Sequence, residues 1–387
     1  MKVAFVGGGP ASIFGALYLK KNRPDIEVYI FDKNNSIGKK LSMTGNGKCN
    51  IAPIKDNIEE YNNPKRVKAL FDNYPLNKYL DLLRDFNIET KNLNNFGYYP
   101  VSESAPNVIK ILESDLEAYG IHFVNDKVLY YNYIEDVDMI ELVFEKNMET
   151  FNHVFFATGG CSYPTSGSDG KAFSIFTSKG YKVHKPEPRL CPVVVRENVK
   201  SLFGTRGKAL CSLYTNGKLV KQEKGEVMFK KDGLSGMCIM NLSRYIDLKQ
   251  KNFIEINFLS DINVVCMNSM TALVYLLSFV PYPIAEYVLK QVRMREDTPL
   301  DEVRATELLD ALKEMDFTVK GLYGFDNAQV TRGGIDLDEV DEYFRSKKEN
   351  HLSFIGEMVD IDAACGGYNL RFAITSGFKA VEILFKK

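Results

Sequence analysis

The residues best suited to chemistry lie at the start of the chain, where small residues follow the spacing of a phosphate-binding turn. Gly7, Gly9 and Ser12 stand in the order G-x-G-x-x-S, and Asp32 comes 20 residues after Ser12. Gly7 permits a tight turn, and Gly9 lets the backbone approach a pyrophosphate that a following helix N-terminus can bind. Asp32 is placed to accept a hydrogen bond from a ribose hydroxyl. The spacing predicts a dinucleotide site, with an ordinary turn that binds no ligand as the alternative.

A strand, a helix and a second strand must hold these residues in place. Residues 2–6 are apolar and rich in β-formers, residues 13–20 have apolar side chains at helical spacing, and residues 27–31 form a second β-rich run. Together they predict a βαβ unit with the glycine turn after its first strand. Ser12 replaces the third glycine of the pattern, so we expect the helix to be slightly displaced rather than the site to be lost.

A second glycine-rich segment, residues 38–50, follows this unit. It contains three glycines, three lysines and two asparagines. Such a loop can wrap around a pyrophosphate and place backbone donors near a flavin ring. The residues by themselves leave open a second interpretation, a flexible basic loop without a ligand.

The motifs of this segment resemble those of the BaiN-like flavoproteins, also described as aminoacetone-oxidase-like FAD enzymes. The resemblance rests on several motifs in a fixed order along nearly the whole chain, which is more specific than any one of them. These motifs are GKK at 38–40, TGNGKCN at 44–50, ATGG at 157–160, SYP at 162–164, GSDG at 167–170, GE at 225–226, Phe229, GLSG at 233–236, TRGG at 331–334, GE at 356–357, Asp360 and GGYNL at 366–370.

The resemblance implies FAD as the cofactor and, together with the glycine spacing, a set of cofactor-binding residues. That set is Gly7, Gly9, Pro10, Ala11, Asp32, Lys33, Lys40, Leu41, Thr44, Gly45, Asn50, Val128, Ala157, Thr158, Gly159, Gly160, Gly356, Glu357, Gly367, Tyr368, Asn369 and Leu370. Gly356 and Glu357 would contact the ribityl chain. A helix that begins near Gly367 would direct its positive end at the flavin, where it stabilises the negative charge of the reduced ring.

Three positions depart from the family pattern. Ala363 and Arg371 stand where we expect glycine and glutamine, and the segment 98–100 lacks an arginine that the family normally carries. Arg371 is therefore expected to add a charge near the flavin edge.

The predicted fold class is α/β, a Rossmann-like FAD-binding domain interrupted by an insertion, as the resemblance also implies. Residues 1–187 and 321–387 would form the FAD-binding domain, and residues 185–188 (KPEP) would be the linker. The insertion would comprise a strand-rich, barrel-like substrate module at 188–262 and a small helical module at 263–320.

The remaining elements follow from apolar periodicity. Helices are expected at 64–86, 105–119, 271–279, 285–294, 303–315 and 367–384, the last closing the FAD-binding domain. Strands are expected at 121–133, 139–144, 154–156, 193–195, 209–214, 226–230, 253–258 and 352–355.

Composition limits the class of protein and its partners. The chain has 387 residues, of which 45% are hydrophobic, and 49 Lys and Arg balance 50 Asp and Glu. This balance gives no electrostatic reason to expect a nucleic acid or a membrane surface as partner. The longest apolar stretch ends at Pro281, the N-terminus lacks the pattern of a signal peptide, and the seven cysteines contain no CxxC pair. We therefore expect a cytoplasmic protein with free thiols and without a metal site, of unknown oligomeric state.

The sequence names no catalytic residue, because flavin enzymes need placement and charge tuning more than a catalytic triad. The four histidines are scattered, and structural roles are expected for His122 and His153. Cys49 and Cys365 are interpreted as packed thiols, with a redox role beside the flavin as the alternative. Arg244, Tyr163 and Tyr368 are weaker candidates for substrate contacts.

The predicted function is an FAD-dependent oxidoreductase that transfers a hydride between the flavin and a small molecule or NAD(P)H. NAD(P)H would be a transient co-substrate, since no second G-x-G-x-x-G turn is present. The resemblance implies two versions, an NAD(P)H-dependent reductase and an amine oxidase that uses oxygen. A tRNA-modifying flavoprotein and a flavin-bound sensor without turnover are further alternatives.

Overall fold

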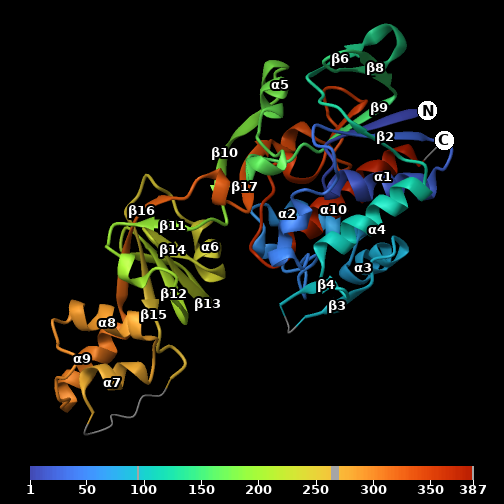
Figure 1. Ribbon diagram of the computed structural model, residues 1–387. Helices are drawn as coiled ribbons and strands as arrows, with labels where there is room; N and C mark the ends of the chain where they lie inside the picture. The colour runs from blue at the N-terminus through green and yellow to red at the C-terminus, as the bar shows by residue number, and fades with distance from the viewer. Residues whose placement is uncertain (94–95, 263–269, 386–387) are drawn as a thin grey trace. The chain divides into compact units, whose positions relative to one another are not determined.

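The computed structural model describes residues 1–93, 96–262 and 270–385, and the chain divides into two compact units (Figure 1). Unit 1 comprises Met1–Glu187 and Val330–Lys387, and unit 2 comprises Pro188–Gln329. Each unit has its own hydrophobic core. The divisions lie at 187/188 and 329/330, and β16 of unit 2 runs to Leu322; the predicted domain limits stay predictions.

Unit 1 is built on a five-stranded parallel sheet with the strand order β18-β9-β1-β2-β5. Its strands are β1 (Lys2–Val6), β2 (Glu27–Asp32), β5 (His122–Asn125), β9 (His153–Phe156) and β18 (Leu352–Phe354). The predicted βαβ unit and the predicted last strand are confirmed. Because the strands are parallel, their carboxyl ends meet at one edge, where ligands of open α/β sheets bind.

Two helices from opposite ends of the chain, α1 (Pro10–Asn22) and α10 (Tyr368–Val381), contact each other in unit 1 (Figure 1). A Cβ atom on Gly377 of α10 would overlap the carbonyl oxygen of Ala11 and lie 3.2 Å from its carbonyl carbon. The close approach of the two helices therefore requires a glycine at this position.

The other helices of unit 1 are α2 (Pro64–Asn73), α3 (Leu76–Asp85), α4 (Ala105–Ala118) and α5 (Ala172–Ser178). The single helix predicted at 64–86 is wrong, since α2 ends before Tyr74 and α3 begins after Pro75. Proline has no N–H and disfavours the helical conformation of the residue before it, so the helix is interrupted there.

Three small sheets complete unit 1 and its connection to unit 2. The first sheet contains β6 (Tyr130–Ile134), β7 (Met139–Val143) and β8 (Met148–Phe151). The second pairs β3 (Thr90–Asn92) with β4 (Tyr98–Pro100). The third pairs β10 (Val183–Arg189) with β17 (Val330–Ile335). The strand predicted at 121–133 is thus two strands, β5 and β6, in different sheets. The predicted linker 185–188 lies within β10.

Unit 2 contains a closed barrel with the strand order β11-β14-β13-β12-β15-β16. Its strands are β11 (Val193–Val195), β12 (Arg206–Thr215), β13 (Lys218–Lys230), β14 (Gly233–Ser235), β15 (Asn252–Asn257) and β16 (Met315–Leu322). Its helices are α6 (Met237–Ser243), α7 (Ala272–Leu277), α8 (Tyr282–Gln291) and α9 (Glu302–Lys313). The last three lie between β15 and β16, so the helical module is an excursion from the barrel; its predicted first residues, 263–269, lie outside the described residues.

Candidate functional site

The first glycine turn joins β1 to α1 at the carboxyl edge of the sheet. Gly7 has φ +108°, and a Cβ atom there would overlap the carbonyl oxygen of Ala157 and lie 2.8 Å from its carbonyl carbon. The Gly7 N–H donates to Phe31 O at 2.7 Å, and the Ala157 N–H donates to Val6 O at 2.8 Å. The turn is therefore held by the ends of the two neighbouring strands, and only glycine fits it.

The start of α1 is open to a ligand. A Cβ atom on Gly9 would meet nothing within 4 Å, and α1 begins at Pro10 without a side-chain cap. The first N–H groups of a helix carry a partial positive charge and bind anions such as a pyrophosphate. Ser12 is fully buried within this helix, and its hydroxyl has no hydrogen-bond partner among the described residues. The open turn fits the pyrophosphate of FAD.

Asp32, the last residue of β2, lies directly beside this turn. Its Oδ2 accepts the Gly8 N–H at 2.6 Å, and its Oδ1 accepts the Asn34 N–H at 2.7 Å. These two bonds fix the carboxylate, and each oxygen keeps a lone pair that can accept a further hydrogen bond. The arrangement fits a ribose hydroxyl, as the spacing predicts.

The loop after β2 is tied to the loop after β9. Lys33 forms an ion pair with Asp169 at 3.0 Å, and Asn34 Nδ2 donates to Ser166 O at 3.1 Å. Lys33 therefore already has a partner within unit 1, and its predicted role as a cofactor contact stays a prediction.

Glu357, just after β18, connects four segments of unit 1. Its Oε2 pairs with Lys40 Nζ at 2.7 Å, and its Oε1 accepts the hydroxyl of Ser162 at 2.9 Å and the N–H of Thr331 at 2.8 Å. Lys40 Nζ also donates to Ser162 Oγ at 2.5 Å. We call Lys40, Ser162, Thr331 and Glu357 the Glu357 cluster. It fixes the predicted contacts Lys40 and Glu357 relative to each other.

The turn at 157–160 leads from β9 into this cluster. A Cβ atom on Gly160 would overlap the side chain of Thr331, and one on Gly159 would lie 3.4 Å from Ser168 Cβ. Thr331 Oγ1 accepts the N–H groups of Cys161 at 2.7 Å and Ser162 at 3.0 Å. The small residues at 157–160 thus serve close packing within unit 1, and contact with a ligand stays a prediction.

Thr331 and Ser162 belong to the family motifs but were not predicted as site residues. They lie 169 positions apart, and the hydrogen bond between them is seen only in the folded chain. The motif resemblance was the one signal in the sequence that could have drawn attention to them.

The loop at 44–50 has a compact conformation. Thr44 O accepts the N–H of Cys49 at 3.0 Å, and Gly45 packs against Asn50, whose N atom would lie 2.7 Å from a Cβ on that glycine. Leu41 and Cys49 are buried. Burial raises the pKa of the Cys49 thiol to about 12. A thiol with so high a pKa is a poor nucleophile, which favours the interpretation of Cys49 as a packed thiol.

The N-terminus of α10 lies against this loop. Gly367 has φ +91°, and a Cβ there would lie 2.6 Å from the carbonyl carbon of Ala52 and 2.8 Å from Asn50 Oδ1. Asn369 Oδ1 accepts the N–H of Ala363 at 2.9 Å, and its Nδ2 donates to Ala363 O at 3.0 Å. These contacts bring the predicted residues Asn50, Gly367 and Asn369 to one place.

Tyr368, Leu370 and Gly356 border the same helix N-terminus. Tyr368 O accepts the hydroxyl of Tyr61 at 2.8 Å, and Leu370 packs partly buried against the core of unit 1. A Cβ on Gly356 would lie 2.9 Å from Ala11 Cβ, which places the loop after β18 against the start of α1. The start of α1 therefore contacts the loop after β18 and the later turns of α10, at Gly377, while the first turn of α10 contacts Tyr61 and Ala52.

Arg371 does not place a free charge at this edge, contrary to the expectation from sequence. Its side chain is fully buried, paired with Asp56 at 3.1 Å, and bonded to Thr375 Oγ1 and the carbonyl of Tyr74. The guanidinium carbon lies 4.1 Å from the ring centroid of Phe71. The charge is thus neutralised within the packing of α2, α3 and α10.

Other candidates lie apart from these turns. Val128 lies between β5 and β6 and packs partly buried against the core. Tyr163 has a left-handed backbone with φ +57° after the 157–160 turn. Arg244 is buried in unit 2, after α6, and Cys365 is partly buried just before α10. His153 is fully buried, bonded to Ser353 Oγ at 2.9 Å, and burial lowers its pKa to about 3.

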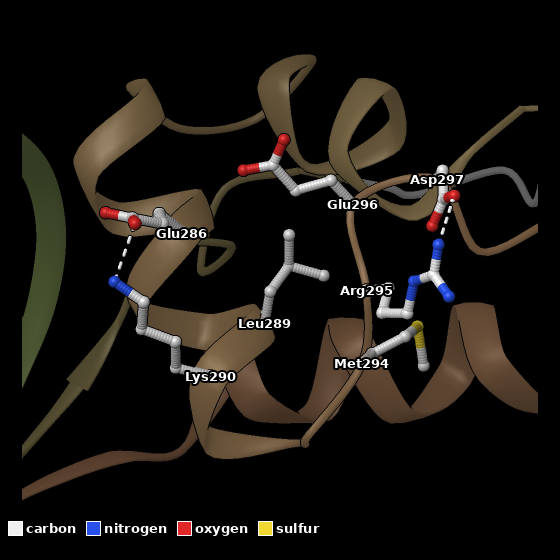
Figure 2. Close-up of a pocket in the computed structure, with 7 residues that line it drawn as sticks. All are labelled: Glu286, Leu289, Lys290, Met294, Arg295, Glu296 and Asp297. Carbon is white, nitrogen blue, oxygen red and sulfur yellow. Dashed lines mark hydrogen bonds and ion pairs between the residues drawn. The ribbon is translucent and has the colours of Figure 1, made fainter.

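The described part of the chain holds neither a metal-binding cluster nor a membrane-spanning helix. In residues 1–93, 96–262 and 270–385 no His, Cys, Asp or Glu group could hold a metal, and no helix there is long and apolar enough for a bilayer. A hollow of about 430 Å³ lies beside α8 in unit 2, and Figure 2 shows that its charged side chains form the ion pairs Glu286–Lys290 and Arg295–Asp297. The fifth charged side chain of its lining, Glu296, accepts the hydroxyl of Tyr282 at 3.0 Å.

Comparison with known proteins identifies the family of the chain. Residues 1–383 match the model of the HI0933-like protein Rossmann domain. The chain belongs to this family. The predicted resemblance is confirmed, since a 3-dehydro-bile acid Δ(4,6)-reductase of Clostridium scindens is 25% identical over 98% of both chains. A ribosomal RNA dihydrouridine synthase of Haemophilus influenzae is 26% identical over 96% of both chains.

A solved structure shares the fold. The E. coli quinol fumarate reductase subunit FrdA aligns with a TM-score of 0.53 at 13% identity, covering 100% of this chain and 70% of that one. Membership of the HI0933-like family makes the chain a flavin-dependent oxidoreductase with a Rossmann-type FAD-binding unit. The predicted fold class is confirmed, including the barrel of unit 2.

Proposed function

We propose that this protein reduces carbon–carbon double bonds conjugated to a carbonyl group, with NAD(P)H as hydride donor and FAD as cofactor. One observation carries the proposal: two relatives with unlike substrates have names that describe the same kind of reaction. A Δ(4,6)-reductase of a 3-dehydro acid removes ring double bonds near an oxo group, and a dihydrouridine synthase saturates the uracil ring.

The geometry of unit 1 supports the cofactor part of this proposal. The N-terminus of α1 would hold the pyrophosphate, and Asp32 would accept a ribose hydroxyl. When bound, FAD supplies a two-electron carrier for hydride transfer. The N-terminus of α10, which has no side-chain cap, carries a positive partial charge that would stabilise negative charge on the reduced cofactor.

The Glu357 cluster would keep the loops around the cofactor in place. Lys40, Ser162 and Glu357 are joined to one another by hydrogen bonds, so we assign them a positioning role. The acid that protonates the substrate is not assigned, since Cys49 and His153 are buried with pKa values far from neutrality, about 12 and about 3.

Anaerobic stopped-flow absorbance tests the direction of hydride transfer. We expect NADH or NADPH to bleach the flavin band at ~450 nm, and a cyclic conjugated ketone to restore it without oxygen. The saturated ketone is the matched control and should leave the reduced flavin unchanged. Bleaching by aminoacetone, with no bleaching by either nicotinamide, would contradict the proposal and support the amine oxidase alternative.

A uridine in RNA is a second candidate substrate, favoured by the relative named ribosomal RNA dihydrouridine synthase. Uracil also contains a double bond conjugated to a carbonyl, so the reaction class is unchanged. Incubation of the holoenzyme and NADPH with uridine-containing RNA, followed by mass spectrometry of the nucleosides, tests for dihydrouridine. Reduction of the ketone but not of RNA would favour the small-molecule substrate.

A further inference from the structure

The balanced charge of the whole chain conceals a basic segment. Residues 188–262, which form most of the barrel, contain 13 Lys and Arg against 7 Asp and Glu, a net charge of +6. The remainder of the chain therefore carries −7. A polyanion would be attracted to this segment and repelled by the rest.

One end of the barrel gathers exposed lysines and aliphatic side chains. The turn between β12 and β13 and the loop before β15 lie side by side, because Asn216 N–H donates to Lys251 O at 2.8 Å and Asn216 Nδ2 donates to Gln250 Oε1 at 3.0 Å. We call the exposed residues of these two segments the tip surface. They are Asn216, Gly217, Lys218, Leu219, Val220, Asp247, Leu248, Lys249, Gln250 and Lys251, so three lysines stand beside one carboxylate.

The three lysines of the tip surface are available to a partner. Among the described residues, no carboxylate lies within ion-pair distance of Lys218, Lys249 or Lys251. The nearby Asp247 bonds within its own loop, accepting the Lys249 N–H at 3.0 Å and Gln250 Nε2 at 2.9 Å. These bonds lower the pKa of Asp247, with the lysine charge adding to the effect.

The aliphatic side chains beside these lysines are unusually exposed. Leu219, Val220 and Leu248 expose 51%, 44% and 55% of their surface. Aliphatic side chains flanked by lysines can contact or insert between bases while the lysines bind phosphates. The half-buried ring of Tyr214, which pairs with Leu219 and stacks on Phe253 at 4.7 Å between centroids, lies beside these side chains and offers a base a stacking face. A membrane surface fits less well, since the patch is small.

We propose that the tip surface binds RNA, with Lys218, Lys249 and Lys251 on the phosphates and the aliphatic side chains against the bases. The proposal rests on the second candidate substrate of the proposed function, a uridine in RNA. It assigns the binding of the polyanion to unit 2 and the reduction to the flavin unit.

Fluorescence anisotropy of the full-length holoenzyme with a labelled stem–loop RNA tests the proposal. We expect the triple variant K218Q/K249Q/K251Q to bind at least tenfold more weakly. The negative slope of log affinity against log salt concentration should become shallower by about 2 to 3, since each phosphate contact contributes about 0.7 to 0.9 to its magnitude. The matched control K65Q/K110Q/K146Q removes three exposed lysines of unit 1 and should bind like the wild type.

The double variant L219S/L248S separates the two contributions. It should weaken RNA binding while leaving the salt slope unchanged, because it removes no charge. Equal binding by the triple variant and the wild type would overturn the proposal, as would failure of the wild type to bind RNA. Lysine-dependent binding to phosphatidylglycerol vesicles with no binding to RNA would also overturn it.

Failure of this proposal and failure of the proposed function can be told apart. RNA binding is measured without NAD(P)H, and reduction of the conjugated ketone is measured without RNA. The triple variant should retain wild-type ketone reduction, since its lysines lie in unit 2 and outside the Glu357 cluster. RNA binding without any reduction contradicts the proposed function alone, and reduction without RNA binding contradicts the tip surface alone.

Discussion

The two units of this chain use glycine for different purposes. In unit 1, Gly7 and Gly9 shape a turn at the carboxyl edge of a parallel sheet, and the space in front of Gly9 is open. In unit 2, a Cβ on Gly233 would overlap the carbonyl oxygen of Val193, the strand neighbour that helps to close the barrel. Unit 1 therefore uses glycine both for close packing, as at Gly7 and Gly377, and at an open turn, at Gly9, whereas Gly233 of unit 2 serves close packing.

The units also differ in charge. Unit 1 has a net charge of −3 and unit 2 of +2, and the barrel segment 188–262 alone carries +6. A flavin cofactor needs only local positive groups, such as helix N-termini, and these do not change the net charge. A polyanionic partner needs many exposed lysines. The comparison therefore assigns cofactor binding to unit 1 and, if RNA is a partner, its binding to unit 2.

The largest difference in stability is expected between the alanine variants of Gly7 and Gly9. Gly7→Ala should cost about 3 kcal/mol or more, because alanine is strained at φ +108° and its Cβ overlaps Ala157. Gly9→Ala should leave the stability of the apoprotein nearly unchanged, since Gly9 has φ −85° and open space. It should nevertheless weaken FAD binding. Thermal unfolding of the apoprotein and FAD titration measure the two effects, and a destabilised Gly9→Ala apoprotein would contradict the assignment.

The same test applied to unit 2 asks whether the two units fold independently. Gly233→Ala should unfold the barrel, whereas Gly321→Ala should not, since a Cβ on Gly321 meets nothing within 4 Å. Because each unit has its own core, Gly233→Ala should leave flavin absorbance intact while protease cuts appear within residues 188–329. Loss of flavin together with the barrel would show that the units depend on each other for stability.

Local pattern in the sequence predicts the first βαβ unit well, because strand, turn and helix are consecutive and each depends on its own residues. The same reasoning fails at Pro75, where periodicity continues across a helix break, and in the stretch 121–133, where one β-rich run supplies two sheets. It also fails for Arg371, whose partner Asp56 lies 315 residues away. Whole-chain charge conceals the basic barrel, since opposite charges elsewhere cancel it.

Removal of the buried guanidinium tests the corrected role of Arg371. Arg371→Ala should cost about 3 to 5 kcal/mol, because it leaves Asp56 without its partner and opens a cavity between Phe71 and Tyr79. Where the holoprotein still folds, its flavin spectrum should match the wild type. Arg371→Met, which keeps much of the volume, should fold better than the alanine variant. A large shift in flavin reduction potential with either variant, without a change in stability, would restore the charge-tuning role.

Glu357→Gln should have a smaller effect, about 1 to 3 kcal/mol, because the amide cannot accept all the donors that the carboxylate binds. Both stability and FAD affinity should fall, since four loops lose a shared partner. Glu149→Gln is the matched control, as its ion pair with Lys2 is more exposed and its loss should be within about 0.5 kcal/mol. Unfolding in urea and FAD titration compare the two variants. Equal effects would show that the Glu357 cluster is not a positioning element.

The smallest effect is expected from pH. His153 is buried and neutral, because burial lowers its pKa in the folded protein to about 3 from an ordinary value of 6.5. Above pH 6.5 His153 is neutral in both the folded and the unfolded chain, so it does not weaken the folded state. As pH falls from 6.5 toward 3, only the unfolded chain binds the proton, and the free energy of unfolding decreases. The loss is at most about 1.4 kcal/mol per pH unit for one proton. Urea unfolding between pH 7 and pH 5 gives the slope of the unfolding free energy against pH. His153→Asn should reduce this slope, whereas His122→Asn, on the exposed edge strand β5, should keep it. An unchanged slope in His153→Asn would mean that other groups govern the acid sensitivity of unit 1.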